Sequence, residues 1–125
     1  MEQRLIFVID DYPGIRRLVE TELQAIGWAV DTFREATEAA AAVRRGRRPA
    51  LVLVDPWGDS DQASPQHELL GLTQPASMIV MSGARTTAAL AEQRGLPVLW
   101  KPFEATALLD AVRNVLPETP QLSNC

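Results

Sequence analysis

The sequence has almost none of the residues that build disulfides and zinc clusters. Its 125 residues include one cysteine, Cys125, and one histidine, His67. A single cysteine cannot form an internal disulfide, which fits a reducing compartment. No cluster of cysteine and histidine offers a zinc site, and His67, in a polar stretch, is interpreted as a surface residue.

Long apolar runs and excess positive charge are also missing. No apolar run approaches the length needed to span a membrane, and the opening "MEQRLIFVIDD" leads from a short apolar segment into acids, unlike a signal peptide. The formal net charge is −4, which disfavours binding to phosphate backbones. The basic stretch 44–48 is interpreted as a solvated helix end. We therefore expect a cytoplasmic protein whose domain binds neither nucleic acid nor membrane.

The remaining composition is that of an ordinary globular domain, with 46% hydrophobic and 22% charged residues. A chain of this length can bury a core without disulfides or metal ions. We predict one domain over residues 1–118. The polar, proline-rich end, 119–125, is predicted to be a flexible tail.

Five short segments are predicted to be strands: 5–9, 28–33, 50–54, 77–82 and 96–100. Helical spacing or composition follows at 15–26, 34–46, 86–95 and 104–116, and the last of these places Ala107, Leu108, Ala111, Val112 and Val115 on one face. Between 58 and 76 at most a short helix fits, around 66–70. The alternation predicts an α/β fold, a five-stranded parallel sheet with helices on both faces, doubly wound and flavodoxin-like with strand order 2-1-3-4-5.

Reactive side chains follow four of these strands. They are Asp10 and Asp11 after the first, Asp55 after the third, Ser82 with Gly83 at the fourth, and Lys101 with Pro102 after the fifth. In open parallel sheets, ligands bind outside the carboxyl ends of the strands. We therefore expect three carboxylates, a hydroxyl and an ammonium at one rim.

That set of groups suits phosphoryl transfer. Carboxylates that repel one another favour a bound cation, and oxygen ligands with a substrate phosphate suit Mg²⁺. A carboxylate can also act as a nucleophile and form an aspartyl phosphate. Lys101 would neutralise phosphoryl oxygens, Ser82 could donate a hydrogen bond to one of them, and Gly83 would leave room for another.

Each of these residues also has an ordinary structural interpretation. Asp10 and Asp11 could cap a helix, Asp55 before Pro56 could form a turn, and Lys101 could be a surface lysine. These interpretations lose force together, because every residue falls at the same edge of the predicted sheet.

The motifs "VIDDYPGIRRLVETEL", "ALVLVDPW", "MIVMSG" and "LWKPFEATALLDAV" resemble the response-regulator receiver domain of bacterial two-component signalling. The resemblance covers the chain from about Leu5 to Leu116. It implies that Asp55 is the phosphoacceptor. It also implies that the chain is a signalling domain and not an enzyme.

The resemblance implies further roles at the matching positions. Asp11 would bind Mg²⁺ directly, with Asp10 as a second acid and with Asp55 and the backbone carbonyl of Trp57 as further ligands. Ser82 would be the switch hydroxyl, and Lys101 would pair with the phosphoryl group. The Lys101–Pro102 bond would be cis.

The implied partners are proteins. The phosphoryl donor would be a phosphohistidine of a sensor histidine kinase or a phosphotransfer protein. Phosphorylation would then shift an equilibrium between inactive and active forms and so change contacts with a downstream protein or a fused domain.

Two departures from the family pattern leave alternatives open. The loop "PWGDSDQASP" and Val98, where an aromatic residue is frequent, suggest a receiver-like interaction module that works without phosphorylation. A magnesium-dependent phosphatase with an aspartyl intermediate is a second alternative. It is disfavoured because Trp57 stands where such enzymes commonly have a second acid.

Overall fold

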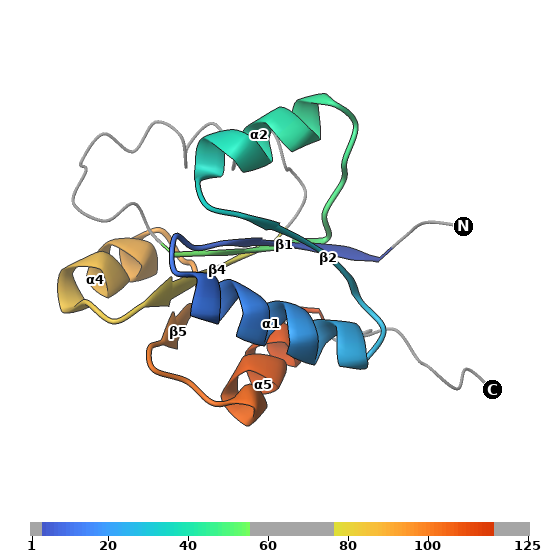
Figure 1. Ribbon diagram of the computed structural model, residues 1–125. Coiled ribbons are helices and arrows are strands. Elements are labelled where there is room, and N and C mark those ends of the chain that lie inside the picture. The colour runs from blue at the N-terminus through green and yellow to red at the C-terminus, as the bar shows by residue number, and fades with distance from the viewer. Residues whose placement is uncertain (1–3, 56–76, 117–125) are drawn as a thin grey trace.

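The computed structural model of the chain describes residues 4–55 and 77–116, which form a layered α/β structure (Figure 1). The elements, in chain order, are β1 Leu5–Ile9, α1 Pro13–Ala25, β2 Ala29–Phe33, α2 Ala36–Arg44, β3 Leu51–Val54, β4 Ser77–Ser82, α4 Arg85–Gln93, β5 Val98–Trp100 and α5 Ala105–Val115. The predicted elements within the described ranges are all present, with bounds that differ by up to two residues. The predicted short helix at 66–70, the domain boundary at 118 and the tail 119–125 lie outside the described residues.

The five strands form one parallel sheet in the order β2-β1-β3-β4-β5. This confirms the predicted fold class and strand order. The central strands β1 and β3 are buried along their whole length, as continuous apolar runs in a sheet covered on both faces should be.

Two apolar layers cover the sheet. One is built with α2 and with Ala91 of α4, and the other with α1 and α5. Figure 1 shows α2 above the sheet and the pair α1 and α5 below it. Both faces of the sheet are therefore closed, and its ends are left to carry polar groups.

Glycines follow the C-terminal ends of two helices. Gly27 follows α1 with a φ of 102°, and Gly46 follows α2 with a φ of 107°, in the left-handed region that glycine adopts without steric cost. Beyond Gly46, the guanidinium of Arg48 donates to the carbonyl of Val43 at 3.0 Å, and Arg47 pairs with Asp31 at 2.8 Å. Arg48 thus donates to a carbonyl at the C-terminal end of α2, in agreement with the interpretation of this stretch as a helix end. Arg47 adds an ion pair with a side chain of the neighbouring strand β2.

One detail of the predicted apolar face of α5 is wrong. Leu108 and Val112 are fully buried, and Ala111 and Val115 pack against the same layer. Ala107, however, is exposed. Leu109, two residues further along α5, packs against this layer instead.

In the described ranges 4–55 and 77–116, none of the helices has the length and apolar character that crossing a membrane requires.

Candidate functional site

The carboxyl ends of β1 and β3 bring two aspartates side by side. Ile9 and Val54 are register partners, and each is followed directly by an aspartate, Asp10 and Asp55. The amide of Asp55 donates to the carbonyl of Ile9 at 2.7 Å, so the pairing of the strands continues to the acid itself. The site therefore begins where the buried part of the sheet ends.

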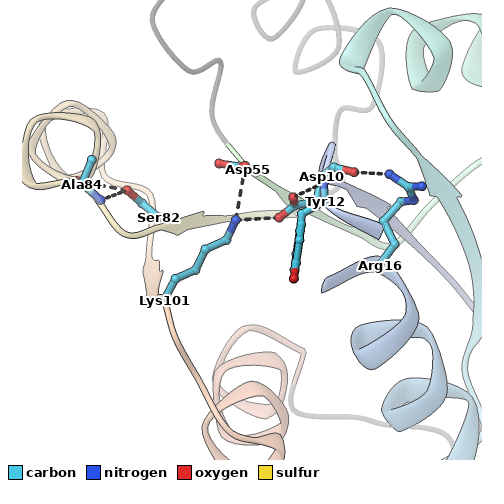
Figure 2. Close-up of polar contacts among 7 residues, drawn as sticks. All are labelled: Asp10, Tyr12, Arg16, Asp55, Ser82, Ala84 and Lys101. Atoms are coloured by element: carbon cyan, nitrogen blue, oxygen red, sulfur yellow. Dashed lines mark hydrogen bonds and ion pairs between the residues drawn. The ribbon is translucent and has the colours of Figure 1, made fainter. Parts of the chain in front are cut away.

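The end of β5 contributes the cation. Trp100 is the register partner of Ser82 in β4, and the amide of the next residue, Lys101, donates to the carbonyl of Ser82 at 2.8 Å. From there the ammonium Nζ lies 2.7 Å from Oδ2 of Asp10 and 3.2 Å from Oδ2 of Asp55. Figure 2 shows Lys101 reaching across to both acids.

Asp10 is the buried member of the acid group, with no exposed side-chain surface. Its Oδ1 accepts a hydrogen bond from the amide of Tyr12 at 2.9 Å, and its own amide donates to the carbonyl of Phe33 at 3.1 Å. The interpretation of Asp10 and Asp11 as helix caps is wrong. The N-cap of α1 is Tyr12, and no side chain in the described part of the chain caps the helix there.

Asp11 completes a group of three carboxylates. One oxygen each from Asp10, Asp11 and Asp55 can be chosen so that all lie within 4.8 Å of one another. Asp11 is exposed, and within the described ranges its carboxylate has no hydrogen bond or ion pair. The donors are all oxygens and one of them is accessible to water, which fits Mg²⁺.

Burial and charge shift the ionisation of the site. Loss of water around Asp55, together with the neighbouring charge of Asp10, raises its pKa to about 6, although Lys101 acts in the opposite direction. For Lys101, burial lowers the pKa, but the hydrogen bond to Asp10 and the charges of both acids outweigh burial and leave the pKa raised. At neutral pH Lys101 is therefore a cation and Asp55 is largely ionised.

Ser82 lies at the rim, but its hydroxyl is turned away from the acids. It donates to the carbonyl of Ala84 and accepts from the amide of Ala84, both at 3.0 Å. Figure 2 shows this pair on the side of Lys101 away from Asp10. Gly83 lies beside Lys101, and a Cβ added to it would meet Lys101 only at ordinary contact distances, 3.6 Å and 3.8 Å.

Two predicted features of the site remain, the cis peptide bond and the backbone carbonyl of Trp57. The Lys101–Pro102 peptide bond is cis. Trp57, predicted to contribute its backbone carbonyl, lies outside the described residues, as do His67 and Cys125.

Two contacts of the site were not anticipated from the sequence. Tyr12 provides the amide that fixes Asp10, and Arg16 of α1 donates to the carbonyl of Asp10 at 2.7 Å. The pair Arg16 and Arg17 on an amphipathic helix gives no sign of this. Both have the pattern of surface residues, and only the packing of α1 on the sheet distinguishes them.

Several solved structures of response regulators and receiver domains superpose on this chain over most of their length. A CheY-like receiver domain protein from Methanospirillum hungatei superposes with a TM-score of 0.79 at 20% identity, covering 94% of this chain and 97% of that one. A two-component response regulator from Clostridium difficile gives a TM-score of 0.77 at 18% identity, covering 98% and 100%. The chain has the receiver-domain fold. Identities this low establish the fold alone.

Sequence comparison points the same way. The chain is 33% identical over 111 residues to the nitrogen assimilation regulatory protein NtrX of Azorhizobium caulinodans, an alignment that covers 83% of this chain. This chain spans about a quarter of that protein, 24% of its length. No family model matches the sequence. The resemblance to response-regulator receiver domains is thus confirmed by both kinds of comparison.

Proposed function

We propose that this receiver-fold chain accepts a phosphoryl group on Asp55 from a phosphohistidine of a sensor kinase or phosphotransfer protein. The observation that supports it best is the bridge of Lys101 between Asp10 and Asp55, at 2.7 Å and 3.2 Å, at the ends of three different strands. A nucleophile, a cation and two further acids at one rim are the parts that phosphoryl transfer to a carboxylate requires.

Asp55 acts as the nucleophile in this proposal. One of its carboxylate oxygens forms a bond to phosphorus while the bond from phosphorus to the imidazole nitrogen breaks. The electron pair of the broken bond returns to that nitrogen, and the donor leaves as neutral imidazole because its other ring nitrogen carries the proton. Since the pKa of Asp55 is about 6, the attacking group is largely ionised at neutral pH.

The other residues position charge around the transferred group. The ammonium of Lys101, already within 3.2 Å of Asp55, lies where it can stabilise phosphoryl oxygens. Asp11, Asp10 and Asp55 would hold Mg²⁺. When bound, the ion offsets the negative charge of the phosphoryl group and of the acids.

Signalling would follow from a change at Ser82. Its hydroxyl now donates to the carbonyl of Ala84, directly before α4, so a hydrogen bond to a phosphoryl oxygen requires Ser82 to give up that donation. That exchange of partners would alter the start of α4 and bias an equilibrium between two arrangements of the domain. The altered surface would then be read by a downstream protein or a fused domain.

The experiment is incubation with Mg²⁺ and acetyl phosphate, followed by the mass of the intact protein. We expect a phosphate adduct in the parent and in Asp110→Asn, an exposed acid on α5, and no adduct in Asp55→Asn. Absence of an adduct from acetyl phosphate and from a phosphorylated kinase would overturn the proposal in favour of an interaction module independent of phosphorylation. Turnover of added phosphomonoesters would instead favour a phosphatase.

A further inference from the structure

We infer that Arg16 is a positioning residue that sets the geometry of the acid group for its cation. The inference rests on the proposed magnesium site and deepens it. Arg16 lies in α1, half-buried, and its Nη1 is 2.7 Å from the backbone carbonyl oxygen of Asp10. Figure 2 shows Arg16 and Lys101 approaching Asp10 from opposite sides in that view.

The carbonyl of Asp10 lies where the chain leaves β1 and turns toward α1. The hydrogen bond from Arg16 to this carbonyl connects the end of the strand to the helix. A charged donor at this distance forms one of the stronger hydrogen bonds in proteins. A buried or half-buried carbonyl without such a partner is costly.

Fixing this carbonyl also fixes Asp11. The peptide group is planar, so the direction of the Asp10 carbonyl determines the plane that carries the amide and Cα of Asp11. The carboxylate of Asp11 has no partner of its own within the described ranges. Its place within 4.8 Å of the other two acids therefore depends on the backbone that carries it.

Asp10 is consequently held at four atoms by four different groups. Phe33 accepts from its amide, Tyr12 donates to Oδ1, Lys101 to Oδ2 and Arg16 to the carbonyl. Three of these contacts would survive the loss of Arg16, but none of the three acts on the peptide plane between Asp10 and Asp11. Among the described residues, Arg16 is the contact that does.

The direction in which Mg²⁺ affinity changes on removal of Arg16 distinguishes a positioning role from a purely electrostatic one. Arg16 is a cation near an acidic site, so removing it should strengthen binding of Mg²⁺ if only charge mattered. If Arg16 positions the acids, its removal should weaken binding, as loss of a group that orients metal ligands commonly does by about 10–100-fold. The two explanations predict opposite changes.

Arg16→Met and Arg17→Met provide a matched pair. Both remove one positive charge from neighbouring positions of α1, and methionine keeps an unbranched stem and a similar helix propensity. Arg17 is exposed and makes no hydrogen bond or ion pair within the described residues. We expect the Kd for Mg²⁺, measured by titration calorimetry, to rise about tenfold in Arg16→Met and to stay unchanged or fall in Arg17→Met.

A second readout uses the protein without metal. The amide of Tyr12, bonded to Asp10, should exchange faster with deuterium in Arg16→Met than in Arg17→Met, because the turn that holds it is loosened. If Arg16→Met does not fold, Arg16→Lys and Arg17→Lys replace the pair. Lysine keeps the charge but lacks the planar guanidinium that reaches the carbonyl, so weaker Mg²⁺ binding is again expected at position 16 alone.

Equal Mg²⁺ affinities and equal Tyr12 exchange in the two variants would overturn the role of Arg16 and leave phosphorylation of Asp55 untouched. A parent protein that binds no Mg²⁺ would overturn the proposed metal site, and the positioning role with it. Failure of the inference alone is thus distinguishable from failure of the proposed function.

Discussion

The ammonium of Lys101 lies 2.7 Å from a carboxylate oxygen of Asp10, across 91 positions of sequence. The carboxylate is fully buried and the ammonium side chain is 21% exposed, so this pair is shielded from the water that weakens surface ion pairs. The contact joins the end of β5, an edge strand, to the end of β1, an interior strand of the sheet.

Replacing Lys101 with methionine should destabilise the fold. The change leaves the buried Asp10 without its counter-charge, and breaking a buried pair from one side typically costs about 3–5 kcal/mol. The free energy of unfolding, from urea titration at neutral pH, should fall by roughly 3 kcal/mol. The same variant should be phosphorylated by acetyl phosphate about 100-fold more slowly, since one stabilising donor is lost.

The control is the double variant Asp10→Asn with Lys101→Met, in which neither partner carries charge. It should recover much of the stability lost in Lys101→Met but none of the phosphorylation rate. Equal stabilities of the single and double variants would contradict a stabilising role for the pair.

The raised pKa of Asp55 predicts how stability depends on pH. The pKa is about 6 in the folded protein against an ordinary value of 3.8, so the folded protein binds more protons than the unfolded chain between these values. Stability attributable to Asp55 should therefore fall as the pH rises from about 4 to about 6 and then stay level. The loss is on the order of 1–2 kcal/mol once the access of water to the partly exposed side chain is allowed for.

Asp55→Asn should remove this contribution. Unfolding followed from near pH 4 to near pH 7 should show the variant becoming more stable than the parent as the pH rises. Asp110→Asn, at an exposed site of α5, should follow the parent curve. A parent and Asp55→Asn that differ by the same amount at every pH would refute the ionisation argument.

The sequence was sufficient to predict the sheet because its strands carry strong local signals. The runs 5–9 and 51–54 are continuously apolar, which requires cover on both faces, and Gly27 and Gly46 mark where helices must stop. The same reasoning predicted which residues end the strands. Since parallel strands end at one edge, Asp10, Asp55 and Lys101 could be expected together before any distance was known.

The directions of the side chains could not be predicted in the same way. Ser82 was predicted to donate a hydrogen bond to a phosphoryl oxygen, and that role stays a prediction; nothing in the sequence indicated that the hydroxyl bonds to the backbone of Ala84 in this structure. Arg16 and Arg17 look alike in sequence, and only the position of α1 on the sheet selects Arg16 for the carbonyl of Asp10. Such choices depend on competition between several partners that only the folded chain brings together.

Magnesium should stabilise the protein through Asp11. A ligand that binds only the folded state raises stability with its concentration, so the melting temperature should rise in millimolar MgCl₂ and return when EDTA is added. In Asp11→Asn the melting temperature without metal should stay close to that of the parent, because the carboxylate has no partner within the described ranges. The rise in melting temperature with Mg²⁺ should be lost in this variant. A rise in Asp11→Asn as large as that of the parent would show that the cation binds elsewhere.

Ser82→Ala should separate phosphorylation from its structural consequence. The hydroxyl accepts from the amide of Ala84 and donates to its carbonyl, at the residue that precedes α4. Removing it leaves that amide unpaired, at a cost of about 1 kcal/mol, so amides in the first turn of α4 should exchange faster with deuterium even without phosphorylation.

Phosphorylation should then have different effects on the two proteins. In the parent, Ser82 must give up its donation to the carbonyl of Ala84 to contact the phosphoryl group, so acetyl phosphate with Mg²⁺ should speed exchange at the start of α4. Ser82→Ala should still gain the phosphate adduct on Asp55, but exchange at α4 should not rise further. Ser82→Thr retains the hydroxyl and should respond as the parent does, and Ser77→Ala, at the opposite end of β4, serves as the matched loss of a hydroxyl. An equal rise in exchange in the parent and in Ser82→Ala would show that the signal reaches α4 without Ser82.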